Sequence, residues 1–110
     1  MAYSEALADR IRDVLAGDDS IAERKMFGGL AFLMHGNMLV GVMGDDLMVR
    51  LGPELGDAAL DEPHTRVMDF TGRPMRSMVI VGSPGVADDA ELESWVARAR
   101  AFVETLPPKA

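Results

Sequence analysis

The stretch MFGGLAFLMHGNMLVGVMG, residues 26–44, decides the fold, because its nineteen positions include no Asp, Glu, Lys or Arg. A transmembrane helix needs roughly 20 mainly apolar residues. The length is just sufficient, but five glycines and the central His35-Gly36-Asn37 argue against insertion into a bilayer. A phosphate-binding loop of the GxxxxGK[ST] type is excluded as well, because Gly28-Gly29 is followed by Leu, Ala and Phe instead of Lys and Ser or Thr.

A β-hairpin is the remaining interpretation of this stretch. Gly36-Asn37 lies between two apolar runs and is a two-residue turn signal, in which glycine supplies a positive φ. With this turn, His35 pairs with Met38 across the hairpin. A further turn leads to a third apolar run at residues 47–51. The sequence therefore predicts three consecutive antiparallel strands.

This register also predicts which side chains share a face of the sheet, because neighbouring residues in a strand point to opposite sides. One face carries Leu33, Val40, Val42, Leu47, Val49 and Leu51. The other face carries Phe32, Met34, Leu39, Met43, Met48 and Arg50. Since neither face is polar, both are expected to need cover.

Apolar periodicity and turn residues predict the other elements. The expected elements are helices at 3–15, 53–60 and 88–106 and strands at 64–70 and 75–81. We therefore predict a single α+β domain over residues 1–110, with a short flexible tail at 107–110. Its architecture is a two-layer α/β arrangement with a mainly antiparallel five-stranded sheet, in the order α-β-β-β-α-β-β-α.

Composition limits the function classes. The chain has 11 Lys and Arg against 18 Asp and Glu, a net charge of -7, which disfavours direct nucleic-acid and anionic-membrane binding. It has no cysteine and two histidines, so neither a metal site nor a cofactor is expected. The N-terminal residues lack the basic and apolar regions of a signal peptide, and a cytoplasmic location is expected.

Positive charge gathers around the second predicted hairpin. His64, Arg66, Arg73 and Arg76 are candidates for binding an anion or a partner. The alternative is that they are ordinary surface residues balanced by neighbouring carboxylates, because exposed ion pairs are common and weak. Neither His35 nor His64 has the sequence context of a catalytic set, so no catalytic residue is assigned and an enzyme is not expected.

Methionine is unusually frequent, with nine residues in the chain. It fills irregular gaps in cores and is also common at adaptable binding surfaces. Core packing is one interpretation. The other is that one face of the sheet is a surface for self-association or for a protein partner, since a large exposed apolar patch is otherwise unfavourable. We therefore predict a homodimer or a partner complex, with the candidate interface residues Phe32, Met34, Leu39, Met43 and Met48.

Five segments carry a family resemblance. They are KMFGG at 25–29, GNM at 36–38, LMVRLGP at 47–53, PHTRVMDFTGRPMR at 63–76 and LESWVARARAFVETLPPK at 92–109. Together they resemble the N-terminal domain of TfoX/Sxy proteins, in the short single-domain form found in many bacteria. The resemblance implies helices on one face of an antiparallel sheet. Full-length members linked to natural competence are transcriptional coactivators that work with the cyclic-AMP receptor protein, and they carry an additional C-terminal helical domain.

Two functional hypotheses follow from different classes. The first is a non-catalytic protein-interaction module of the TfoX/Sxy type, with a regulatory role in transcription or competence by resemblance only. The alternative is a small anionic ligand-binding domain, or an enzyme, that uses the region of His64, Arg66, Arg73 and Arg76. Direct DNA binding ranks third, because no predicted helix has a basic face.

Overall fold

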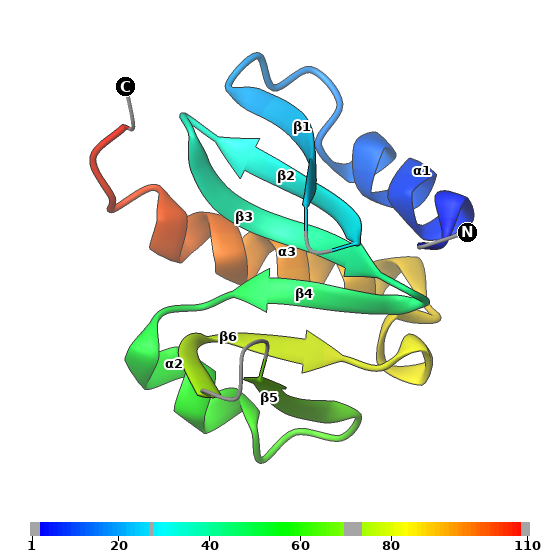
Figure 1. Ribbon diagram of the computed structural model, residues 1–110, viewed down its shortest axis with the longest axis vertical. Coiled ribbons are helices and arrows are strands. Elements are labelled where there is room, and N and C mark those ends of the chain that lie inside the picture. Colours follow the sequence, from blue (N-terminus) through cyan, green and yellow to red (C-terminus); the bar gives the residue numbers. More distant parts are fainter. Residues whose placement is uncertain (1–2, 27, 70–73, 109–110) are drawn as a thin grey trace.

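The uncharged stretch folds into two neighbouring strands, as predicted, in a computed structural model that describes residues 3–26, 28–69 and 74–108 (Figure 1). The helices are α1 (Glu5–Val14), α2 (Pro53–Ala59) and α3 (Asp89–Val103), with a short 3-10 helix η1 (Ser83–Val86). The strands are β1 (Ile21–Met26), β2 (Gly29–Met34), β3 (Asn37–Met43), β4 (Asp46–Arg50), β5 (Thr65–Asp69) and β6 (Pro74–Val81). All strand pairs are antiparallel, in the order β1-β2-β3-β4-β6-β5. The α+β fold is confirmed.

The sheet has six strands rather than the predicted five, because β1 was missed. Its sequence, IAERKM, is exposed at the four positions between its two partly buried ends. An edge strand of this kind lacks the alternation of buried and exposed residues that identifies strands in a sequence. Charged side chains on an edge strand are a common protection against pairing with other chains.

The turn between β2 and β3 also differs from the prediction by one residue. His35 and Gly36 are the central residues, with φ angles of 49° and 82°, and Met34 pairs with Asn37. Two central residues with positive φ are typical of a type I′ turn, which matches the twist of a hairpin. The register shifts by one residue further along the hairpin. Phe32 pairs with Val40 and Leu33 pairs with Met38, so Leu39 has no residue opposite it in β2.

These two differences change the faces of the sheet. Phe32, Met34 and Leu39 are 1%, 3% and 0% exposed, and they belong to the core beneath the helices. Their predicted place on the same face as Met43 and Met48 is therefore wrong. A shift of one residue moves a strand's side chains to the opposite face, and the bulge at Leu39 brings two successive residues to the same side.

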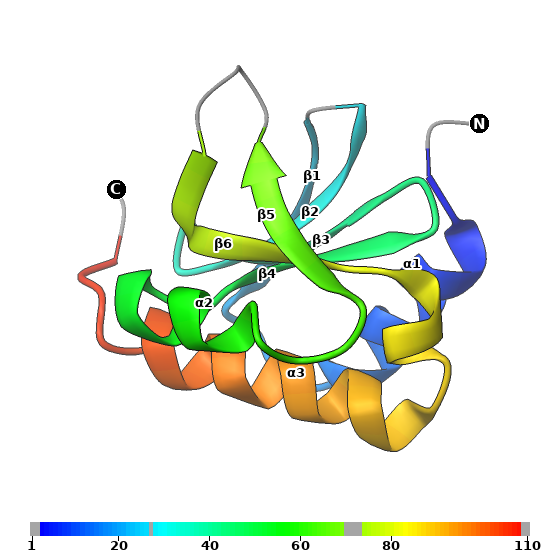
Figure 2. The ribbon, with the colours of Figure 1, turned by 90° about the horizontal axis from the view of Figure 1, so that it is seen from below.

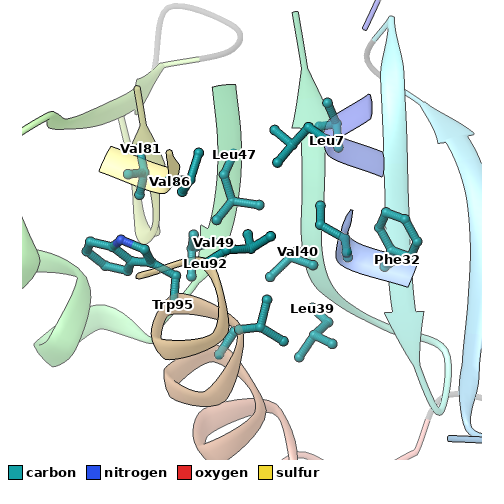
Figure 3. Close-up of a cluster of buried hydrophobic side chains, with 14 of the residues drawn as sticks. Leu7, Phe32, Leu39, Val40, Leu47, Val49, Val81, Val86, Leu92 and Trp95 are labelled. Carbon is teal, nitrogen blue, oxygen red and sulfur yellow. The ribbon is translucent and has the colours of Figure 1, made fainter. Parts of the chain in front are cut away.

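The main core lies between the sheet and the three helices, which all cover the same face (Figure 2). Figure 3 shows Leu92 and Trp95 of α3 beside side chains from the central strands, including Val49. Fully burying an aliphatic side chain of this size contributes roughly 1.5–3 kcal/mol. This face of the sheet positions α3 and the start of β5, which together form the site described below.

The other face of the sheet forms a second, smaller core. Met48, Met68, Met78 and Ile80 are between 0% and 8% exposed, and Met38 and Met43 pack against them while remaining partly buried. The β1–β2 and β5–β6 ends of the sheet rise on this side, away from the helices, so that the face is concave (Figure 2). Register shifts in the β2–β3 and β5–β6 pairs are consistent with this curvature, since bulges bend strands.

The methionine face is thus not the open docking surface that the sequence suggested. Met48 has no exposed surface in a single chain, and only Met43 of the five predicted interface residues is more than marginally accessible. Gly41 lies beneath this cluster, where an added Cβ would be 2.5 Å from the Met48 methyl carbon. Long, unbranched methionines that fold over a bare glycine can fill a concave face without a covering helix.

Ion pairs connect α1 and α3 to β1 and to the loop that precedes it. Arg12 of α1 donates two hydrogen bonds of 2.8 Å to the carboxylate of Glu23 in β1, and a third to Asp9. The hydrogen bonds from Arg12 lower the pKa of Glu23. Within the loop between α1 and β1, Asp18 forms an ion pair with Arg100 of α3, in which a carboxylate oxygen and a guanidinium nitrogen are 2.7 Å apart.

Asp18 supplies a prediction about acid stability. Its pKa is lowered, chiefly by the hydrogen bond from the Ser20 hydroxyl and then by the one from the Ser20 backbone N–H at 2.9 Å. A folded-state pKa below the unfolded value of about 3.9 gives stability that is present above that value and is lost as pH falls through the folded pKa. Asp18→Asn should therefore lower the Tm at pH 7 but have little effect near pH 2.

Thermal unfolding followed by circular dichroism at pH 7, 4 and 2 measures this difference. The matched control is Asp19→Asn, which removes the same charge from an exposed neighbour with no hydrogen bond or ion pair within the described residues. A gap in Tm between the wild type and Asp18→Asn that is the same at pH 7 and pH 2 would contradict the assignment.

Candidate functional site

Of the predicted basic cluster, the described side chains are those of His64 and Arg66, and these two have different contacts. Arg66, in β5, donates a hydrogen bond of 2.6 Å to Asp46 at the start of β4. Arg50 lies elsewhere, with its guanidinium 5.8 Å from the centre of the Phe102 ring in α3. Arg73 lies outside the described residues, and Arg76 lies in β6, where its side chain is also outside them. His64 lines a hollow.

His64 has an unusual backbone conformation. Its φ of 66° is in the left-handed region, which residues with a side chain rarely adopt. Its carbonyl oxygen accepts a hydrogen bond of 2.7 Å from the Gly82 N–H. Gly85 of η1 lies directly against it, since a Cβ added there would be 3.1 Å from the His64 Cβ. The turn after β6 therefore fixes the position at which the chain enters β5.

The hollow beside His64 has a volume of about 290 Å³. It is formed by residues 62–64, by η1 and by one side of α3, and the α3 residues that line it are Glu91, Ser94, Trp95 and Arg98. The Arg98 guanidinium is 4.3 Å from the centre of the Trp95 ring and 2.7 Å from a carboxylate oxygen of Glu62. A cation over an indole face is attracted by the ring's quadrupole, so the guanidinium has a favourable contact with Trp95 as well as with Glu62.

The free edge of β5 adjoins the hollow, because β5 begins directly after His64. Among the described residues, β5 pairs with β6 alone, and its other edge has no backbone partner. Val67 at the middle of this strand is 43% exposed, and Leu55 of α2 is 55% exposed. These two are the exposed large hydrophobic side chains of the described chain, and both belong to elements at the β5 end of the molecule (Figure 1).

The two edges of the sheet therefore differ in chemistry. The edge strand β1, at the opposite end of the molecule, exposes three consecutive charged residues, Glu23, Arg24 and Lys25. The β5 edge exposes Arg66 and Val67, and the arginine is already paired with Asp46. Charged residues protect an edge against strand addition, whereas an exposed β-branched residue favours it.

Within residues 3–26, 28–69 and 74–108, no group of three or more His, Cys, Asp or Glu side chains could hold a metal ion. No helix in the same ranges has the length and apolar character needed to cross a bilayer.

A comparison with protein-family models decides the family. The model of the TfoX N-terminal domain matches residues 13–103. The chain belongs to the TfoX N-terminal domain family. No match was found among curated proteins or among solved structures. The family resemblance in the sequence is thereby confirmed.

The matched range of this TfoX N-terminal domain contains both the β5 edge and the whole hollow. Sequence reasoning identified His64 but missed the α3 residues beside it. One signal was available, because Trp95 and Arg98 are three residues apart and so lie on the same side of a helix. The pairing of Arg98 with Glu62 across 36 positions had no such signal.

Proposed function

We propose that this TfoX N-terminal domain is a non-catalytic protein-interaction module that adds an extended segment of a partner protein to the free edge of β5. The observation that carries the proposal is the combination of an unpaired strand edge with the exposed side chain of Val67. In strand addition, backbone hydrogen bonds supply affinity and alternate side chains supply specificity.

The described charges around β5 favour a basic partner segment, because Arg66 and Arg98 are already paired with Asp46 and Glu62. Glu54 and Asp57 of α2 and Asp61 in the following loop are exposed at the same end of the sheet. The chain as a whole carries a net charge of -7. Two copies of such a chain repel each other, whereas a basic segment is attracted and its encounter rate is raised. We therefore propose a heterologous protein partner rather than a second copy.

A regulatory role in transcription or competence, and a cytoplasmic location, belong to the same proposal. The family supports the regulatory role. The absence of cysteine fits a reducing compartment. The homodimer predicted from the sequence loses its main support, because the methionine face that suggested it is buried within one chain.

Site-specific crosslinking tests the proposal. A photoreactive amino acid placed at position 67 in the native host should yield a covalent product with one heterologous protein, whereas the same group at position 24 in β1 should not. With that partner purified, hydrogen exchange should slow at the amides of residues 65–69. Val67→Lys should weaken binding about tenfold or more, which corresponds to about 1.4 kcal/mol.

The matched control is Ala22→Lys, which adds the same charge at an exposed position of the other edge strand. Both variants should remain folded, since neither position is buried. Crosslinks at position 67 to a second copy of the chain alone would replace the proposal with a homodimer. Equal crosslinking at positions 24 and 67, or none at 67, would also contradict it.

A further inference from the structure

The hollow lies beside the start of β5, and therefore near one end of any segment that is added to this strand. Residues 62–64 form one wall and lead directly into Thr65, the first residue of β5. Figure 2 views the molecule from the side on which β5 and the preceding loop are in the foreground. An added strand would lie about 4.8 Å from β5. A long side chain near one end of that segment would therefore be within reach of the hollow.

The charges that line the hollow leave one carboxylate without a partner. The positive charge of Arg98 is compensated by Glu62, whose carboxylate accepts a hydrogen bond of 2.7 Å from the guanidinium. Glu91 of α3 also lines the hollow, and its exposed side chain makes no hydrogen bond or ion pair with the described part of the chain. The hollow therefore keeps a net negative charge when its histidine is neutral.

The rest of the lining suits an aliphatic stem. Pro63, Pro84 and Trp95, which is 6% exposed, belong to its lining and supply apolar surface. Lysine and arginine bury their methylene stems along apolar surface while keeping the charged head near water or an anion. The positive φ of His64 and its hydrogen bond to Gly82 hold one rim in place, so that little ordering is needed on binding.

We infer that this hollow anchors a lysine or arginine side chain of the partner segment, with its stem against Pro63, Pro84 and Trp95 and its cationic head at Glu91. The inference rests on the proposed strand addition at β5 and adds the chemistry of one recognised residue. It excludes an acidic residue at that position, because Glu91 would repel it.

Capped amino acids test the hollow separately from the strand edge. In a titration followed by two-dimensional NMR, N-acetyl-lysine methylamide should shift the Trp95 indole N–H and the Ser94 amide. The norleucine and glutamate analogues, which lack the cationic head, should bind about fivefold more weakly or not at all. Glu91→Gln should remove the preference for lysine, whereas Glu93→Gln, which changes the same charge outside this hollow, should preserve it.

The partner complex supplies the second readout. Glu91→Gln should lower the yield of crosslinks from position 67 several-fold, and Glu93→Gln should leave it unchanged. If position 67 captures the partner but the hollow shows no preference for lysine over norleucine, the anchor is overturned and the proposed function stands. If the hollow prefers lysine but position 67 captures nothing, the proposed function is overturned, and the role of the hollow as an anchor is overturned with it.

Discussion

Replacing Gly52 with alanine is expected to lower the free energy of unfolding by about 3 kcal/mol, as the sum of a backbone cost and a packing cost. Gly52 joins β4 to α2 with φ 87° and ψ 163°, a backbone conformation that is essentially restricted to glycine and costs a residue with a Cβ about 1–3 kcal/mol. The new Cβ would also lie 2.7 Å from two carbons of the Phe102 ring in α3. Overpacking of this kind typically costs about 1–3 kcal/mol.

Gly17 provides a matched control for this substitution. Its φ of 85° is also positive, but a Cβ added there would meet nothing within 4 Å. Gly17→Ala should therefore show the backbone cost alone, about 1–2 kcal/mol, in urea denaturation. In the background of Phe102→Leu, the loss caused by Gly52→Ala should shrink toward that of Gly17→Ala. Equal losses at positions 17 and 52 in the wild-type background would show that Phe102 does not restrict Gly52.

The elements that were predictable from the sequence are those with strong local signals. Glycine and the absence of charge identified β2 and β3, and helical periodicity identified α1 and α3 close to their observed bounds. The short helix after Pro53 was also predictable, because proline is tolerated at a first helical turn. β1 lacked such a signal, since its position at the sheet edge leaves most of its residues exposed.

The faces of the sheet were less predictable than its strands. The hairpin sequence allowed the turn at His35-Gly36 as well as at Gly36-Asn37, and both histidine and asparagine can adopt the positive φ that such a turn requires. The bulge at Leu39 leaves no mark in an apolar run. A single-residue difference in register was enough to assign Phe32 and Met34 to the wrong face.

The site depends on contacts that sequence proximity does not reveal. The prediction grouped His64 with Arg66 because they are close in the chain. In the structure they have different neighbours: Arg66 pairs with Asp46, whereas His64 lies beside residues of η1 and α3. The hollow brings residues 62–64 together with two later segments, residues 84–85 and 91–98, which lie about 20 to 36 positions further along the chain. Antiparallel pairing of β5 with β6 creates this proximity, because it returns the chain to η1 beside His64.

Met48→Lys is expected to be the most destabilising of the substitutions on the concave face, with a loss of about 3–5 kcal/mol in the free energy of unfolding. Met48 is 0% exposed, at the centre of the cluster with Met68 and Met78. An ammonium group there would have no carboxylate among the residues of the cluster, and burial of an unpaired charge is strongly unfavourable. Since the free energy of unfolding of a typical domain is about 5–15 kcal/mol, this variant should be unfolded or only marginally stable at 37 °C.

Met43→Lys and Met48→Leu distinguish a buried core from a docking surface. Met43 is only partly buried near the end of β3, so its lysine can reach water, and a loss below about 1.5 kcal/mol is expected. Met48→Leu keeps nearly the same volume and should cost less than about 1.5 kcal/mol. Urea denaturation of the three variants measures the contrast. If Met48→Lys is as stable as Met43→Lys, the concave face is open to solvent, and the methionine surface rather than the β5 edge becomes the better candidate for binding a partner.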